Sequence, residues 1–211
     1  MSELHIFVDS CETSYSCVAY LRSEMGKSNT CTQVAAKTKV SPILWTSIPY
    51  LELLSAVLGV NLGKMIERAL KIAETTYWSD SLDVLNWIGQ PSRGFKPFVA
   101  HRIGQIHQDS NPINWRYVPS VQNPADIGAR GCSVDELINN DMWENGPNYL
   151  KCNQKSCPSR IKQYKTNVET KKRKNFGLSK EKSQPKRNEE NLLHKRHRNM
   201  EIKPASLFQL D

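Results

Sequence analysis

The sequence has few cysteines and no long hydrophobic run. Its 211 residues include six cysteines, too few for the disulfide framework of a small secreted domain. The start MSELHIFVDS lacks the basic segment of a secretory signal, and the most apolar stretch, near residues 53–60, is too short to span a bilayer. We therefore expect an intracellular protein, cytoplasmic or nuclear, with reduced thiols and no membrane partner.

An excess of positive charge is confined to one part of the chain. The whole sequence carries a net charge of +8. Residues 1–150 hold 12 basic and 15 acidic side chains, a balance of −3, whereas residues 151–211 hold 17 and 6, a balance of +11. This asymmetry predicts one domain over residues 1–150, long enough for a sizeable core, followed by a basic tail over residues 151–211.

The tail is polar, rich in lysine and without hydrophobic periodicity. Such a segment buries too little apolar surface to offset the entropy of ordering, so we expect disorder there. Two basic runs, KKRK at 171–174 and KRHR at 195–198, are typical both of nuclear-import or nucleic-acid-binding signals and of ordinary solvated tails. The sequence leaves both interpretations open.

Hydrophobic patterning in the domain predicts a mixed sheet with helices. Apolar or alternating runs predict an antiparallel meander of three strands and then two further strands, at about residues 5–8, 16–21, 31–40, 75–79 and 115–119. Apolar spacings of three and four, or capping residues, predict helices at about residues 47–70, 82–88 and 98–107, a short one opened by Asn123 and Pro124, and one over 133–139. Small residues on the longest helix, Gly59 and Gly63 among them, favour close packing on the sheet, whereas Gly128 weakens the helix after Pro124.

Four carboxylates fall at the ends or starts of these elements. Asp9 follows the first strand and Asp80 the fourth, while Glu52 and Asp126 are expected in the first turns of two helices. Each alone has an ordinary explanation as a cap or a partner of a helix dipole. If the first and fourth strands are neighbours, however, Asp9 and Asp80 meet, and the two helix starts can aim the other carboxylates at the same point. Carboxylates this close require cations, and Mg²⁺ prefers such ligands.

Longer stretches of the domain resemble a known family. In chain order they are FVDSCETSYSCVAYLR, VAAKTKVSP, SIPYLELLSAVLG, YWSDSLDVLNWI, KPFVAHRIGQI, NWRYVPSVQNPADIGARG and WENGP. They are similar to the ribonuclease H region of Bel/Pao-type LTR retrotransposon polyproteins over about residues 4–150. The resemblance implies an α/β, ribonuclease H-like fold with a five-stranded mixed sheet and helices on both faces. It also implies that the catalytic, metal-binding residues are Asp9, Glu52, Asp80 and Asp126.

The resemblance implies a reaction as well. In two-metal phosphodiester hydrolysis, two Mg²⁺ ions, or Mn²⁺ in their place, clamp the attacking and leaving oxygens. The implied substrate is the RNA strand of an RNA/DNA hybrid, selected by shape and by 2′-hydroxyl contacts. Reverse transcriptase and integrase regions of a parent polyprotein are the implied protein partners, so we expect a polyprotein fragment or a derived remnant.

A basic loop and helix start form a candidate nucleic-acid contact. Basic side chains alternate there with an aromatic ring, in Arg93, Phe95, Lys96 and Arg102. Such a set suits phosphate binding and base stacking. Composition alone fits a solvated surface with Phe95 as a core anchor equally well, and the fold context favours nucleic-acid contact.

Two functions from different classes remain open. The first is a magnesium-dependent ribonuclease H-type endonuclease. The alternative is a catalytically silent nucleic-acid-binding module in which the fold survives and the tail supplies affinity. The presence of all four carboxylates favours the enzyme. A retroviral-type aspartic protease is disfavoured because no Asp-Ser/Thr-Gly triplet occurs, and an integrase core normally ends its acidic set with Glu.

Overall fold

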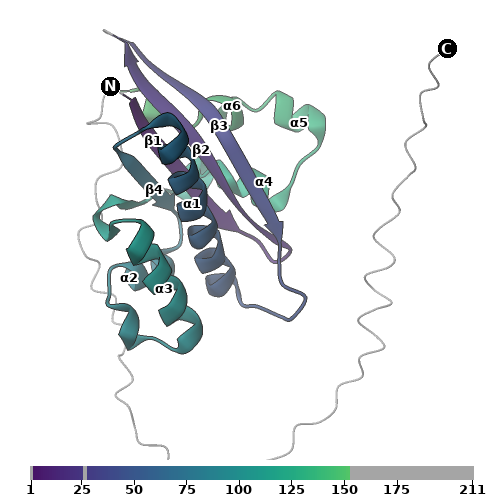
Figure 1. Ribbon diagram of the computed structural model, residues 1–211. Coiled ribbons are helices and arrows are strands. Elements are labelled where there is room, and N and C mark those ends of the chain that lie inside the picture. The colour runs from purple at the N-terminus through teal and green to yellow at the C-terminus, as the bar shows by residue number, and fades with distance from the viewer. Residues whose placement is uncertain (1, 26–27, 153–211) are drawn as a thin grey trace, which may run out of the picture. The chain divides into compact units, whose positions relative to one another are not determined.

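The structure is a computed structural model that describes residues 2–25 and 28–152 (Figure 1). The strands are β1 (Ser2–Ser10), β2 (Ser14–Met25), β3 (Ser28–Val40), β4 (Thr75–Ser79) and β5 (Trp115–Tyr117). The helices are α1 (Ile48–Leu70), α2 (Leu82–Ile88), α3 (Pro97–Asp109), α4 (Ala125–Arg130), α5 (Val134–Ile138), α6 (Asp141–Asn145) and α7 (Asn148–Lys151). Short 3₁₀ turns are η1 (Ser92–Gly94), η2 (Pro112–Asn114) and η3 (Ser120–Gln122).

The strands form one mixed sheet in the order β3-β2-β1-β4-β5. The first three strands are an antiparallel meander, as the sequence predicts. β4 pairs with β1 in parallel, with Val8 opposite Ser79, and β5 pairs with β4 in parallel. The residues that follow these two partners, Asp9 and Asp80, therefore lie at the same edge of the sheet.

Helices cover both faces of the sheet (Figure 1). Along β1, Leu4, Ile6 and Val8 belong to one apolar cluster that includes α1, α2 and α3. Phe7 belongs to a second cluster on the other face, which includes α4 and α7. This alternation follows from the two-residue period of a strand. The predicted fold, a five-stranded mixed sheet with helices on both faces, is confirmed.

The long helix α1 packs on the sheet through its small residues. A methyl group added at Gly59 would overlap Val8 Cγ1 and lie 3.2 Å from Ile6 Cγ2, and one added at Gly63 would lie 3.3 Å from the ring of Tyr77. These glycines let the helix backbone approach β1 and β4. The predicted close packing is therefore observed, and it sets the position of Val8, which directly precedes Asp9.

A buried ionic group holds the opposite end of β1. The Arg22 guanidinium, whose side chain is 1% exposed, donates through Nη1 to Glu3 Oε2 at 3.0 Å and through Nε to the Leu150 carbonyl at 2.9 Å. His5 accepts at Nδ1 from the indole N–H of Trp78 at 3.2 Å. Because Arg22 contacts the backbone of α7, this group ties the end of the described chain to the sheet.

The structure differs from the sequence predictions at several helix ends. Ser47 is the residue before α1, but its hydroxyl makes no capping bond. The cap of α2 is Ser81, whose hydroxyl accepts from the Val84 amide, and not Asp80. Helices α6 and α7 were not predicted. No helix in residues 2–25 and 28–152 is long and apolar enough to cross a membrane.

Two predictions about the C-terminal part stay untested. The domain boundary at residue 150 is one of them, and Lys151 still belongs to α7. The expected disorder and the basic runs at 171–174 and 195–198 lie outside the described residues.

The packing of α1 predicts that Gly59→Ala destabilises the protein. The added methyl group must displace Val8 or Ile6, and overpacking of this kind costs about 1–3 kcal/mol. Gly104→Ala in α3 is the matched control, because nothing lies within 4 Å of its added methyl group. It should leave the free energy of unfolding unchanged or raise it by up to about 1 kcal/mol. Urea denaturation measures both, and equal effects would contradict the packing argument.

Candidate active site

Three of the four predicted carboxylates come together at the edge of the sheet where β1 and β4 end. Asp9 is the second-last residue of β1, Asp80 follows β4, and Asp126 is in the first turn of α4. The charges of Asp80 and Asp126 both act on the Asp9 carboxyl. The structure thus brings together residues that are far apart in the sequence.

Asp9 is the most buried member of this set. Asp9 is 6% exposed, and its Oδ1 accepts a hydrogen bond from the Ser10 amide at 2.7 Å. Burial, and then the negative charges of Asp80 and Asp126, raise the pKa of Asp9 to about 8. Burial and nearby like charge therefore both disfavour the ionised form of this carboxyl.

Glu52 reaches the same edge from α1. The helix begins at Ile48 and has no acidic residue in its first turn, so the prediction that Glu52 lies in that turn is wrong by one residue. Its Oε2 accepts from the Ser81 hydroxyl at 2.5 Å. Burial and the charges of Asp80 and Asp83 raise the pKa of Glu52. Glu52 is therefore electrostatically coupled to Asp80.

Hydrogen bonds from the chain also hold Asp80 and Asp126. Asp80 Oδ1 accepts from the side-chain amide of Asn123 at 3.3 Å. Asp126 Oδ1 lies 2.5 Å from Nε of Arg130, one helical turn away. Each of the four predicted carboxylates thus has one oxygen fixed by a neighbouring group, which orients it at the edge of the sheet.

The donor set suits Mg²⁺ or Mn²⁺ in its chemistry. All four side chains offer carboxylate oxygens, the ligands that hard cations prefer. Within residues 2–25 and 28–152, however, no three His, Cys, Asp or Glu side chains are arranged to enclose one metal ion. The observation that fits a cation is the approach of Asp80 and Asp126 to Asp9, because their negative charges raise the pKa of the Asp9 carboxyl. These residues provide ligands of the right type without a preformed three-ligand cage.

The predicted nucleic-acid residues divide into two pairs. Arg93 in η1 and Lys96 before α3 are exposed. Phe95 is half-buried and packs edge-on against Trp87. Arg102 stacks on Phe98, with its guanidinium carbon 3.4 Å from the ring centre, and donates to the Phe98 carbonyl. Phe95 and Arg102 thus make contacts within the protein, whereas Arg93 and Lys96 are accessible to a ligand.

Sequence reasoning did not single out several features near the carboxylates. Ser81 and Asn123, which donate hydrogen bonds to Glu52 and Asp80, were noted at most as caps, because their carboxylate partners are remote in the sequence.

The loop between β3 and α1 exposes Ile43, Leu44 and Trp45, each by more than four-fifths of its surface. Their apolar side chains in a row were a readable signal for a contact surface.

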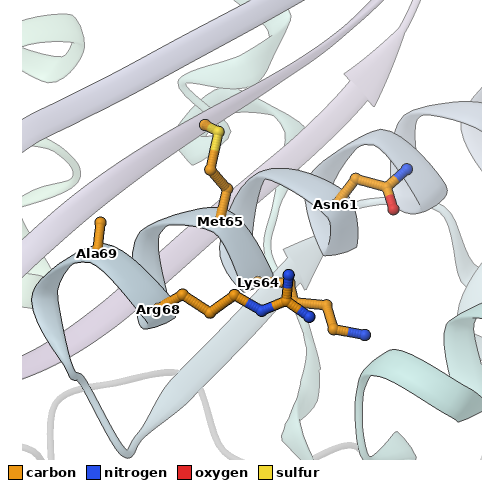
Figure 2. Close-up of a pocket in the computed structure, with 5 residues that line it drawn as sticks. All are labelled: Asn61, Lys64, Met65, Arg68 and Ala69. Carbon is orange, nitrogen blue, oxygen red and sulfur yellow. The ribbon is translucent and has the colours of Figure 1, made fainter.

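A groove lies elsewhere on the surface, along the second half of α1. Figure 2 shows its lining residues Asn61, Lys64, Met65, Arg68 and Ala69. Lys64 and Arg68 extend to one side of the helix and Met65 to the other (Figure 2), and Lys64 is paired with Asp109 of α3. None of the four predicted carboxylates lines this groove, so the two sites are separate.

The chain is similar to one known family and to several solved structures. Residues 1–81 match the family described as "Pao retrotransposon-like RNaseH-like domain", and no curated protein matches the chain. Solved structures that resemble it include the N-terminal ribonuclease H domain of a Mycobacterium tuberculosis protein, fused to maltose-binding protein, with 16% identity and a TM-score of 0.45 over 62% of this chain and 92% of that one. The ribonuclease H1 of Halobacterium salinarum has 11% identity and a TM-score of 0.39 over 59% and 89%.

A third similar structure is LC11 ribonuclease H1 in complex with an RNA/DNA hybrid, with 10% identity and a TM-score of 0.43 over 60% of this chain and 91% of that one. The family match covers Asp9, Glu52 and Asp80 and ends before Asp126. Over residues 1–81 it confirms the resemblance stated above, and with the observed strand order it supports the ribonuclease H-like fold.

The raised pKa of Asp9 predicts a pH dependence of stability in metal-free buffer. Between about pH 4, near the ordinary value of 3.8, and about pH 8, the folded chain holds this proton more tightly than the unfolded chain. Stability should therefore fall as the pH rises through this window. Asp9→Asn removes the effect and should raise the free energy of unfolding at pH 8 by a few kcal/mol, since one pKa unit corresponds to about 1.4 kcal/mol.

Denaturation at pH 4 and pH 8 with a chelator measures this difference. Asp135→Asn, an exposed carboxylate in the first turn of α5, is the matched control and should follow the wild type at both pH values. If Asp9→Asn is no more stable than the wild type at pH 8, the carboxyl of Asp9 is not under this repulsion.

Proposed function

We propose, from the match of residues 1–81 to the Pao retrotransposon-like RNaseH-like domain, that this chain is a magnesium-dependent nuclease that hydrolyses the RNA strand of RNA/DNA hybrids. Its catalytic, metal-binding residues in this proposal are Asp9, Glu52, Asp80 and Asp126. The observation that carries the proposal is the approach of Asp80 and Asp126 to the buried carboxyl of Asp9. Carboxylates this close repel each other and destabilise the folded protein unless a bound ligand of opposite charge compensates them.

The chain's own groups have two tasks in this proposal. Asp9 must lose its proton before its carboxylate can bind a cation, which couples binding to pH. Ser81 and Ser10 fix one oxygen of Glu52 and of Asp9, so that each carboxylate keeps its orientation. Bound Mg²⁺ would supply the activation of a water molecule and the neutralisation of charge on the phosphate.

The substrate and the partners are part of the same proposal. Exposed Arg93 and Lys96 would contact phosphates of the hybrid, which fix its position without reading sequence. Contacts with 2′-hydroxyl groups would distinguish the RNA strand. Reverse transcriptase and integrase regions would be the neighbours of this domain in a parent polyprotein.

Two observations favour a second candidate, a catalytically silent nucleic-acid-binding module. Arg130 already neutralises Asp126 through a contact of 2.5 Å, and the described residues hold no preformed three-ligand group. A chain that keeps the fold but binds no cation would show both features. Activity and hybrid binding, measured together, separate the two candidates.

Asp80→Asn is predicted to abolish cleavage of a labelled RNA/DNA hybrid. Asp80 acts on both Asp9 and Glu52, so loss of its charge weakens the whole set. Loss of several kcal/mol of transition-state stabilisation corresponds to at least ~100-fold in rate. Gel analysis of a 5′-labelled RNA strand with Mg²⁺ measures the rate, and fluorescence anisotropy checks that binding persists.

The control is Asp135→Asn, which should cleave as fast as the wild type. Hybrid binding by a wild-type chain that cleaves no faster than Asp80→Asn would reject the enzyme and support the silent module. Omission of the cation, with a chelator present, should reduce wild-type cleavage to the level of the variant.

Arg93→Ala combined with Lys96→Ala is predicted to weaken hybrid binding and its salt dependence. Each lost phosphate contact lowers the slope of log affinity against log salt by about one, so the slope should fall by about two. Arg68→Ala with Lys71→Gly removes the same charge at the far end of α1 and is the matched control; glycine suits Lys71, whose φ is 54°. Equal slopes for both double variants would exclude Arg93 and Lys96 as phosphate contacts.

A further inference from the structure

Asn123 is a fully buried polar residue in the loop before α4. Asn123 is 0% exposed. The side-chain amide donates from Nδ2 to the Val8 carbonyl at 3.1 Å and to Asp80 Oδ1 at 3.3 Å. Its Oδ1 accepts from the Ala125 amide at 3.2 Å. The carbonyl and the amide of the backbone have fixed roles as acceptor and donor, so these contacts determine which atom of Asn123 is nitrogen and which is oxygen.

These three bonds reach the three segments that carry Asp9, Asp80 and Asp126. Val8 directly precedes Asp9 at the end of β1, and Ala125 directly precedes Asp126 in α4. The third bond goes to the Asp80 carboxylate itself. The backbone carbonyl of Asn123 also accepts from the Asp126 amide at 3.2 Å. One side chain is thus bonded to β1, to the residue after β4 and to the start of α4.

We propose that Asn123 is a positioning residue that sets the geometry of the Asp9, Asp80 and Asp126 carboxylates for cation binding. This inference rests on the proposed function and adds a residue to its site. The amide donates to Asp80 Oδ1, which fixes the rotation of that carboxylate. Through the backbone of Val8 and Ala125 it also fixes the spacing between the strand end and the start of α4.

The chemistry of the position admits few other side chains. It needs two N–H donors and one acceptor on a short side chain, which a primary amide supplies. Aspartate has no donor when ionised and would add a negative charge beside Asp80. Glutamine is one methylene longer in a site with no exposed surface. Serine keeps an acceptor for the Ala125 amide but has only one hydrogen to donate. The variant therefore can keep the bond to Ala125 while it loses at least one of the bonds to Val8 and Asp80.

Asn123→Ser is therefore the informative variant. It should fold, because a serine hydroxyl can still accept from the Ala125 amide, and its Mn²⁺ affinity should fall about 10–100-fold, the usual effect of losing a group that orients a metal ligand. In cleavage of the hybrid, kcat should fall while KM stays unchanged, because the hybrid itself does not contact a buried amide. Asn140→Ala, which removes the Asn cap of α6, is the matched control and should change neither quantity.

Isothermal titration with Mn²⁺ measures the affinity independently of cleavage, and thermal unfolding shows that each variant is folded at the assay temperature. A double-mutant cycle with Asp80→Asn tests the route of the effect. If Asn123 acts through Asp80, Asn123→Ser should lower Mn²⁺ affinity less in the Asp80→Asn background than in the wild type. A purely structural role would instead give the same loss in both backgrounds.

The outcomes for this inference and for the proposed function are distinct. A folded Asn123→Ser chain with wild-type Mn²⁺ affinity and wild-type kcat overturns the positioning role and leaves the nuclease proposal standing. A wild-type chain that binds Mn²⁺ in an Asn123-dependent way but cleaves no hybrid supports the positioning role and rejects the nuclease. A wild-type chain that binds no Mn²⁺ overturns both.

Discussion

The parallel pairing of β1 with β4 is the interaction on which the rest of this structure depends. It places Val8 opposite Ser79 and so brings Asp9 and Asp80 to one edge of the sheet. Parallel neighbours need a long crossover, which α1 provides as it runs over the face of the sheet. Gly59 and Gly63 allow that helix to lie close to β1 and β4. The same helix carries Glu52, so the crossover both permits the pairing and brings a fourth carboxylate to this edge.

Concentrating carboxylates at this edge has an energetic cost that the surrounding groups reduce. Burial and like charge disfavour the ionised form of Asp9. Hydrogen bonds from Ser10, Ser81 and Asn123 and the contact with Arg130 each engage one carboxyl oxygen of the set. Bonds to charged groups are stronger than those between neutral partners. The edge is therefore held in place by the chain itself, in a state that favours a cation.

The opposite end of β1 is organised differently. There Arg22 joins Glu3 to the backbone of α7 in a buried group that contains both signs of charge. Removing one partner from such a pair is strongly destabilising. The fold thus anchors the end of the described chain near the start of β1, at the opposite end of this strand from Asp9, where opposite charges compensate each other. The like charges are kept at the other end of β1, where Asp9, Asp80 and Asp126 lie.

The sequence by itself determined the five strands, the longer helices α1 to α3 and the positions of four carboxylates at or near the ends of such elements. Strand alternation and helical spacing are local patterns, so β4, α2 and the small residues of α1 that face the sheet could be predicted. The family resemblance supplied the candidate site residues. Local rules also misjudged some positions. Gly128 was expected only to weaken α4, yet an added methyl group there would lie 3.3 Å from Ser16 Cβ and closer still to its hydroxyl. Glycine is needed for that contact.

Only the tertiary structure decided how the carboxylates are held. The bonds of Asn123 to Val8 and Asp80, and of Ser81 to Glu52, join residues that are far apart in the chain. Their partners depend on strand order and helix placement, which no local pattern encodes. The raised pKa of Asp9 has the same origin, because burial and neighbouring charge exist only once the chain has folded.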